Sequence, residues 1–361
     1  WRRLGRVRQH HAISSIADFV AARYGKSGPL ASMVTILAVI AIIHYLALQL
    51  RAIALSAAVI LEPTAGSIAS TTNGVLFLTG ILAILAMIFG TRPIANTEQH
   101  GGLMLAVAFE SFVKLFALLC VAIFFVFAAP ENIHQISKDV AETFHQVQLI
   151  GVPDTFWIQT LLAGLAIICL PRQFHVAVVE LRDEKHIRGA RRWFAVYLVL
   201  TIIAIIPIAS WALHATPGYL AIPDVAVLSL PLSYGQDWLT LLAFLGGFSA
   251  STGMLLVSSV ALSIMLSNDL IMPALWRTNL LSRHDKRLPL VLKFTRRVCI
   301  LAVMLLGFLF FHFFNDIDQL SVFGLLAFSA VAQFSPALIG GLYWRGGSKQ
   351  GVYAGLLAGF G

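Results

Sequence analysis

The sequence predicts an all-α polytopic membrane protein, meaning a bundle of helices that crosses a lipid bilayer several times. Of the 361 residues, 58% are hydrophobic and only 12% are charged, whereas a soluble domain carries about 25% charged residues. Apolar runs long enough to cross a bilayer recur along the chain. The basic residues gather in the short segments between these runs, which is the pattern of membrane-protein loops.

The basic residues also indicate an orientation. Lys138 stands alone on one side of the predicted membrane, and Arg51, Lys114 and Arg172 lie inside spans, so the remaining 21 of the 25 lysines and arginines fall on the other side. Short cytoplasmic loops carry such an excess. We therefore expect residues 1–29 in the cytoplasm. The net charge of +8 is thus explained by the basic cytoplasmic loops of a membrane protein, which argues against nucleic acid as a partner.

Two regions are expected: a basic, amphipathic cytoplasmic segment at residues 1–29 and a transmembrane domain at residues 30–361. In the first, Ser15 is placed to cap a short helix, with Asp18 three residues on. Nine spans are expected in the second, at about residues 30–61, 74–89, 101–129, 155–183, 193–214, 238–266, 297–314, 319–344 and from 351 onward. Because the chain opens on Trp1 and stops inside an apolar run, we expect it to belong to a longer polypeptide, with the ninth span cut short.

The fourth span is predicted to be broken. Pro171 lies near its middle and is followed by Arg172, Gln173 and His175. Proline removes a backbone donor and clashes with the carbonyl four residues back, and in hydrocarbon the freed groups need partners within the protein. Broken helices with polar residues at the break form binding sites in secondary transporters. The alternative is a simple kink, with Arg172 reaching to a membrane interface.

Two further pairs of polar residues lie inside spans. Glu110 and Lys114 are four residues apart on one helix face, which favours either a structural ion pair or a carboxylate that carries a coupling proton. Tyr45 and Gln49 form a polar stripe one turn apart. That stripe indicates either the lining of a cavity or hydrogen bonds between helices.

The sixth span contains the hydroxyl residues Ser249, Ser251 and Thr252 among several glycines. Small residues usually mean close helix packing, but clustered hydroxyls can also ligate a hard cation such as sodium. The sequence contains no P-loop, GxSxG, HExxH or CxxC motif. We therefore expect no catalytic residues, no resident cofactor and no structural metal, and Na⁺ or H⁺ only as a coupling ion.

Several stretches resemble the sodium:solute symporter family. They are ISSIADFVAARYGKS (13–27), PRQFHVAVVELRDEKHIRGARRW (171–193) and FSPALIGGLYWRGGSKQGVYAGLLAGF (334–360). Within that family the chain is most similar to the transporter-like membrane domain of CbrA-type sensor histidine kinases. The stretches behind this similarity are YLALQLRAIALS (45–56), GTRPIANTEQHGGLMLAVAFESFVKL (90–115), LPRQFHVAVVE (170–180) and GGFSASTGMLLVSSVALSIMLSNDLIMP (246–273).

The resemblance implies an inverted-repeat, LeuT-like transporter fold that lacks its first two core helices here, in a bacterial inner membrane. It implies a membrane domain that binds or transports a solute, an amino acid such as histidine. A sensor histidine kinase would link that domain to two-component signalling through a response regulator. The alternative is a stand-alone sodium- or proton-coupled symporter. In neither case is this chain itself an enzyme.

Candidate site residues follow from the spans and the resemblance together. The substrate-binding candidates are Tyr45, Gln49, Arg172, Gln173 and His175. The ion-coupling candidates are Ser249, Ser251, Thr252 and Glu110. Where the family has two adjacent hydroxyl residues, this chain has Ser249 and Ala250, so we expect coupling to a proton, or to no ion, over sodium.

Overall fold

The structure is a computed structural model. It describes residues 1–10, 13–61, 72–91, 101–127, 154–214, 223–279, 287–314 and 320–361, together with a few residues between 134 and 145. All regular structure within these ranges is helical. Seven helices are long and apolar enough to cross a membrane, and a bent helix pair makes an eighth span. By helix length and hydropathy, the chain is a multi-pass membrane protein, as predicted.

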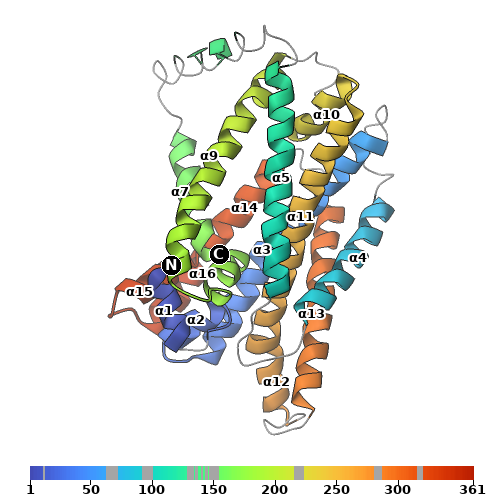
Figure 1. Cartoon of the computed structure of the whole chain (residues 1–361). Coiled ribbons are helices and arrows are strands. Elements are labelled where there is room, and N and C mark those ends of the chain that lie inside the picture. Colours follow the sequence, from blue (N-terminus) through green and yellow to red (C-terminus); the bar gives the residue numbers. More distant parts are fainter. Residues whose placement is uncertain are drawn as a thin grey trace.

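The helices follow one another without strands between them in the described ranges (Figure 1). In chain order they are α1 (Arg2–His10), α2 (Ile16–Arg23), α3 (Gly28–Leu61), α4 (Thr72–Gly90), α5 (Gly101–Phe127), α7 (Asp154–Cys169), α8 (Pro171–Phe174), η2 (His175–Val179), α9 (Lys185–His214), η3 (Pro223–Val225), α10 (Ala226–Ser233), α11 (Asp237–Leu266), η4 (Ser267–Ile271), α12 (Met272–Arg277), α13 (Leu288–Phe313), α14 (Leu320–Ala332), α15 (Ser335–Tyr343) and α16 (Lys349–Phe360).

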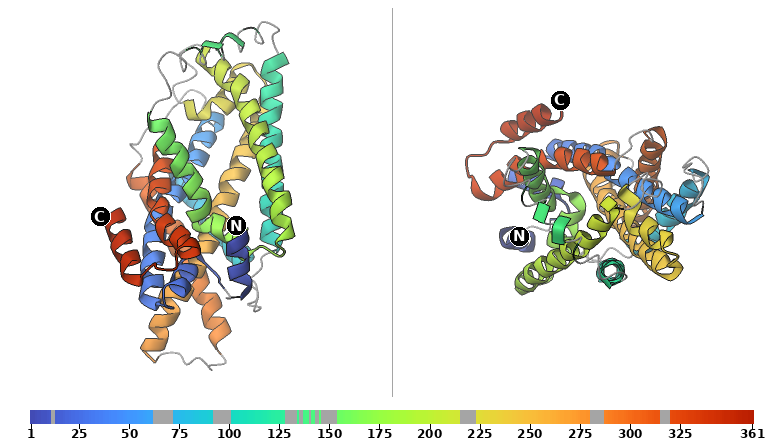
Figure 2. Two further views of the ribbon diagram at one scale, coloured as in Figure 1. Left: turned by 90° about the vertical axis from the view of Figure 1, so that its left-hand side faces the viewer. Right: turned by 90° about the horizontal axis from the view of Figure 1, so that it is seen from above.

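Helices α3 and α11 form the centre of the bundle. The span that begins with α11 is 61% buried over its most apolar window and α3 is 56% buried, against 28% for α5 and 22% for α9. Helix α3 packs against α11, α13 and α14, and α5 packs between α11 and α9. Seen from above, α5 stands at the periphery (Figure 2). The outer helices therefore present most of their surface to lipid.

The predicted break in the fourth span is confirmed. Residues Thr155–Cys169 of α7 and the segment Pro171–Val179 meet at an angle of 49°. Pro171 is the first residue of α8, and Leu170 before it is extended, with φ −60° and ψ 123°. Proline disfavours the helical conformation in the residue that precedes it, so the break lies at Leu170. The π-helix η2 follows directly after α8.

Three of the expected boundaries were wrong. Helix α9 begins at Lys185, eight residues before the expected start, and α13 begins at Leu288, nine residues early. The sixth span does not end at Leu266 but continues through η4 and α12 to Arg277. Lysine, arginine and leucine all favour helices, so these charged segments extend the spans instead of forming loops. The expected span ends at 128–129 and 319 lie outside the described residues.

The expected eighth and ninth spans also differ from a pair of straight helices. Residues 320–343 are together long and apolar enough to form one span. They divide into α14 and α15 at Gln333 and Phe334, just before Pro336. Helix α16 has 12 residues. At about 1.5 Å per residue it is roughly 18 Å long, whereas the hydrocarbon core is about 30 Å thick. The described part of α16 is therefore too short to cross the membrane alone.

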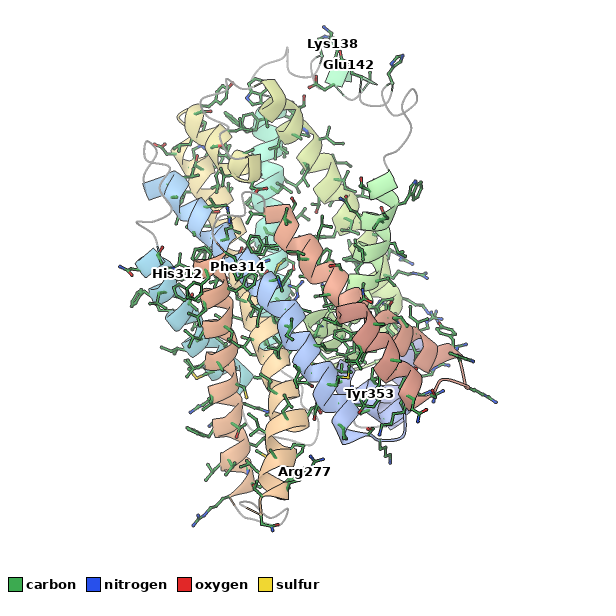
Figure 3. The ribbon with its side chains drawn as sticks, turned by 180° about the vertical axis from the view of Figure 1, so that it is seen from behind. Lys138, Glu142, Arg277, His312, Phe314 and Tyr353 are labelled. Carbon is green, nitrogen blue, oxygen red and sulfur yellow. The ribbon has the colours of Figure 1, made fainter. Side chains whose placement is uncertain are left out.

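One end of the bundle holds the arginines of α1, α2 and α12. Arg277 lies at the end opposite Lys138 and Glu142 (Figure 3). Helices α1, α2, α12 and α15 lie in the same half as Arg277, and α10 lies in the other half (Figure 1). We call the half that holds Arg277 the basic end. In α2, the Ser15 hydroxyl accepts a hydrogen bond from the Asp18 backbone N–H at 3.0 Å, as predicted.

The close approach of α5 and α11 depends on Gly246. A Cβ added there would lie 2.7 Å from the Cβ of Ala117 and 3.4 Å from the Cα of Lys114. We expect Gly246→Ala to force the two helices apart and to destabilise the protein by about 1–3 kcal/mol. Thermal unfolding in detergent measures the effect. Gly247→Ala is the matched control, because nothing lies within 4 Å of its added Cβ; equal melting temperatures for the two variants would contradict the prediction.

Candidate functional site

Charged and aromatic side chains from four helices meet inside the bundle. We call them the Glu110 cluster; its members are Tyr45 on α3, Glu110 and Lys114 on α5, Arg172 on α8 and Tyr197 on α9. Glu110 interacts electrostatically with both Lys114 and Arg172. By formal charge the cluster holds two cations and one anion, so it carries one excess positive charge within the described residues.

Glu110 lies in a space that a glycine provides. Only 8% of its surface is exposed, and its carboxylate lies against Gly253 of α11, where any added Cβ would overlap it. Lys114 is one turn further along the same face of α5, and its charge interacts with that of Glu110. A carboxylate in a membrane helix is costly unless such partners are present.

Arg172 joins the cluster because the chain breaks just before it. Its guanidinium lies over the ring of Tyr45, with 5.3 Å between the central carbon and the ring centroid. The Tyr45 hydroxyl in turn donates to the sulfur of Met254 at 2.9 Å. The buried Nε of Arg172 has no hydrogen-bond partner within the described part of the chain. Arg172 therefore retains donor capacity inside the protein.

A cavity of about 450 Å³ adjoins the cluster. It lies between α3, α5, η3 and α10, α9 and α11, and Lys114 and Tyr197 belong to both the cluster and the cavity wall. The Lys114 ammonium lies 5.8 Å from the centroid of the Tyr197 ring. The polar residues of the wall are Ser56, Lys114, Tyr197, Thr201, Asp224 and Ser251. Small-molecule sites generally occupy about 300–1,000 Å³ with a few polar groups among apolar ones.

Asp224 brings a carboxylate to this wall. It belongs to the short helix η3, and its Oδ2 accepts a hydrogen bond from the Leu320 backbone N–H at 3.0 Å. Asp224 is exposed and η3 leads directly into α10. Because α10 lies in the half opposite the basic end, the Asp224 part of the cavity is on that side.

The structure separates the predicted substrate-binding residues. Tyr45 and Arg172 meet in the Glu110 cluster, and Gln49 is buried on α3 one turn from Tyr45. Gln173 is half-buried, and neither it nor His175 belongs to the cavity wall. His175 lies in η2, where its Nε2 is 3.4 Å from Oε1 of Glu180; both side chains are nearly fully buried.

The predicted ion-coupling residues are also divided. Ser251 is buried and lines the cavity. The Thr252 hydroxyl donates to the Ser249 carbonyl at 3.0 Å, on α11 itself. Glu110 lies against Gly253. Within the described ranges, no group of three or more His, Cys, Asp or Glu side chains is arranged to hold a metal ion.

Several wall residues had no signal in the sequence. Asp224 lies in a stretch that reads as an ordinary loop, and Tyr197 lies in a span rich in aromatic and aliphatic residues. Lys114 was recognised only as the partner of Glu110. Each becomes a site candidate because of long-range packing, which places η3 and α9 beside α5 and α11.

The pair of His175 and Glu180 predicts a stability effect. We expect His175→Ala to lower stability by about 3 kcal/mol, because it removes a buried ring beside Glu180 and leaves a cavity. Thermal unfolding in detergent tests this. The double variant His175→Leu with Glu180→Leu should recover much of the loss, since two apolar side chains refill the cavity and no buried polar group is left there. His186→Ala, at an exposed position of α9, is the control; an equal effect there would refute a specific role for the pair.

Comparison of the chain with protein-family models and with curated proteins gives no match.

Proposed function

We propose that this chain is the amino-acid-binding domain of a membrane transporter or transporter-derived sensor, in a bacterial inner membrane with the basic end in the cytoplasm. The observation that carries the proposal is the junction of the Glu110 cluster with the cavity through Lys114. A buried charged cluster beside a broken membrane helix is the arrangement expected of a midplane solute site. The resemblance to sodium:solute symporters supports the same reading.

The charges of the wall favour a zwitterion as the solute. Lys114 offers a cation for a carboxylate, and the excess positive charge of the cluster strengthens that preference. Asp224 offers a carboxylate for an ammonium group. Ser56, Thr201 and Ser251 add hydroxyl groups to the same wall. An α-amino acid carries an ammonium group and a carboxylate bonded to the same carbon, and the wall offers one residue of opposite charge for each of them.

Histidine is the proposed solute within this class, on the strength of the resemblance to CbrA-type membrane domains. The cavity volume of about 450 Å³ accommodates an amino acid with a ring-bearing side chain. On this proposal Lys114 and Asp224 bind the two backbone charges, and Arg172 adds to the positive charge of the cluster. The sensor and transporter roles share this one site, since binding is the first step of both.

Two analogues of histidine distinguish the proposed roles of the two charged residues. Histamine lacks the carboxylate and imidazole propionate lacks the ammonium group. We expect Lys114→Met to weaken histidine binding at least about tenfold, because a charge-assisted hydrogen bond is lost, while leaving histamine binding unchanged. Asp224→Asn should weaken histidine binding but leave imidazole propionate unchanged. Isothermal titration of the purified protein in detergent measures all four combinations.

The control for these variants is Lys293→Gln, which removes a lysine charge at an exposed position of α13. It should leave every affinity unchanged. If Lys114→Met weakened histidine and histamine equally, Lys114 would not be the carboxylate partner. Failure of the wild-type protein to bind histidine at all would contradict histidine as the solute.

Uptake of labelled histidine into proteoliposomes tests the coupling ion. We expect an imposed sodium gradient to leave uptake unchanged, because Ala250 has no hydroxyl at the position where the resemblance implies a sodium ligand. A proton gradient alone should drive uptake if the chain transports. Stimulation by sodium would contradict this expectation. Binding without uptake under either gradient would assign the chain to sensing, and protein-free liposomes provide the background.

A further inference from the structure

A second cavity, of about 470 Å³, lies at the basic end and is lined by four basic side chains. We call it the arginine pocket. Its walls come from α1, α2, the turn after α2 and the end of α15. The lining residues are Arg3, Arg6, Val7, Phe19, Ala22, Arg23, Lys26, Gly341 and Leu342. No acidic side chain belongs to the described lining, so the pocket is a concentration of positive charge.

The positive charge of the arginine pocket is only partly neutralised. Arg6 forms an ion pair with Glu184 at 3.0 Å. Arg23 instead donates to two backbone carbonyls, those of Gly341 at 2.7 Å and Trp344 at 3.0 Å. These carbonyls carry no formal charge, so the guanidinium remains a cation toward a ligand.

The other two basic residues are exposed. Arg3 lies over the ring of Tyr343, 4.3 Å from its centroid. Lys26 is held in the left-handed region, with φ 52°. Among the described residues neither has a carboxylate partner within 4 Å, so both offer their charge to an anion that enters the pocket.

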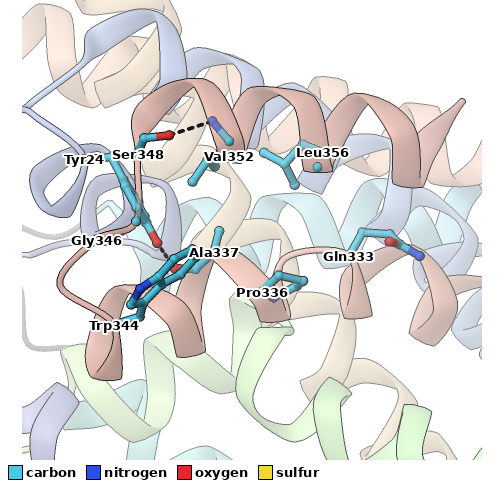
Figure 4. Close-up of a pocket in the computed structure, with 12 residues that line it drawn as sticks. Tyr24, Gln333, Pro336, Ala337, Trp344, Gly346, Ser348, Val352 and Leu356 are labelled. Carbon is cyan, nitrogen blue, oxygen red and sulfur yellow. Dashed lines mark hydrogen bonds between the residues drawn. The ribbon is translucent and has the colours of Figure 1, made fainter.

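The frame of the pocket is fixed by contacts between α2 and α15. Next to Arg23, the Tyr24 hydroxyl donates to the Ala337 carbonyl at 3.0 Å (Figure 4). Burial raises the pKa of Tyr24 above its usual value, against the opposing charge of Arg23, so the hydroxyl stays protonated and remains a donor. The pocket therefore exists before any ligand arrives, which reduces the ordering cost of binding.

The surroundings of the pocket distinguish a lipid from a small soluble anion. Val7, Phe19, Ala22 and Leu342 give it an apolar wall beside the charges. Directly after Leu342, Tyr343 and Trp344 are 67% and 66% exposed. Exposed tyrosine and tryptophan at the end of a membrane span mark the level of the lipid headgroups. Basic pockets at that level between membrane helices bind the headgroups of anionic lipids.

We propose that the arginine pocket is a binding site for the phosphate headgroup of an anionic phospholipid in the leaflet at the basic end. Arg3, Arg23 and Lys26 bind the phosphate oxygens, and the apolar wall contacts the first part of the lipid chains. The site is separate from the cavity proposed for the amino acid, which has no lining residue in common with it. A lipid bound in the arginine pocket would contact α1, α2 and α15 at once.

The test uses the whole purified protein in phosphatidylcholine nanodiscs, into which phosphatidylglycerol is titrated. Binding is followed by native mass spectrometry of the released protein and its retained lipids. The variant is Arg3→Gln with Lys26→Gln, because both side chains are exposed whereas Arg23 holds α2 to α15. We expect affinity for phosphatidylglycerol to fall about thirty-fold, on the basis of the usual contribution of two basic residues near an anionic membrane surface.

The matched control is Arg345→Gln with Lys349→Gln, which removes two exposed charges near the same end but outside the pocket. Its affinity should stay within about threefold of wild type. An equal loss in both double variants would show diffuse attraction and overturn the pocket, as would no loss in either. Inorganic phosphate is tested as a competitor; if it displaced the lipid at low millimolar concentration, the ligand would be free phosphate and the lipid assignment would be overturned.

Discussion

The structure depends on the placement of three charged side chains inside a membrane-spanning bundle. Hydrocarbon offers no water to a charge, so Glu110, Lys114 and Arg172 must be compensated by protein groups. Helix α5 brings Glu110 and Lys114 to one face, and the break before Pro171 brings Arg172 toward them. A straight fourth span would carry Arg172 in a different direction. The charges can therefore meet only because the fourth span is bent.

Helix α5 shows how the bundle holds charge while facing lipid. Phe109, Phe112 and Phe116 are 68%, 66% and 50% exposed on its outer surface, and Glu110 points inward. This is the reverse of a soluble amphipathic helix, in which the apolar stripe faces the core. Because lipid is as apolar as leucine, association with α11 comes from close packing and polar contacts, which is why the approach at Gly246 matters.

Features that depend on neighbouring residues could be predicted from the sequence. The break at Pro171 and the cap at Ser15 are local, and the Glu110–Lys114 pair needs only the helical repeat. The early start of α9 was missed because charge was interpreted as loop. The contribution of Asp224 to the cavity could not be predicted, since it requires η3 to pack beside α5 and α11. No local pattern encodes that contact.

Gly253 has a consequence for how this protein can change over evolutionary time. The Glu110 carboxylate occupies the volume that any side chain at position 253 would fill. A lineage that acquires alanine there must shorten or remove the acid on α5, and a lineage that loses the acid leaves a void on α11. We therefore expect the two positions to change together. Sequence covariation between them, across relatives that have kept the bundle, would be a historical record of the buried charge.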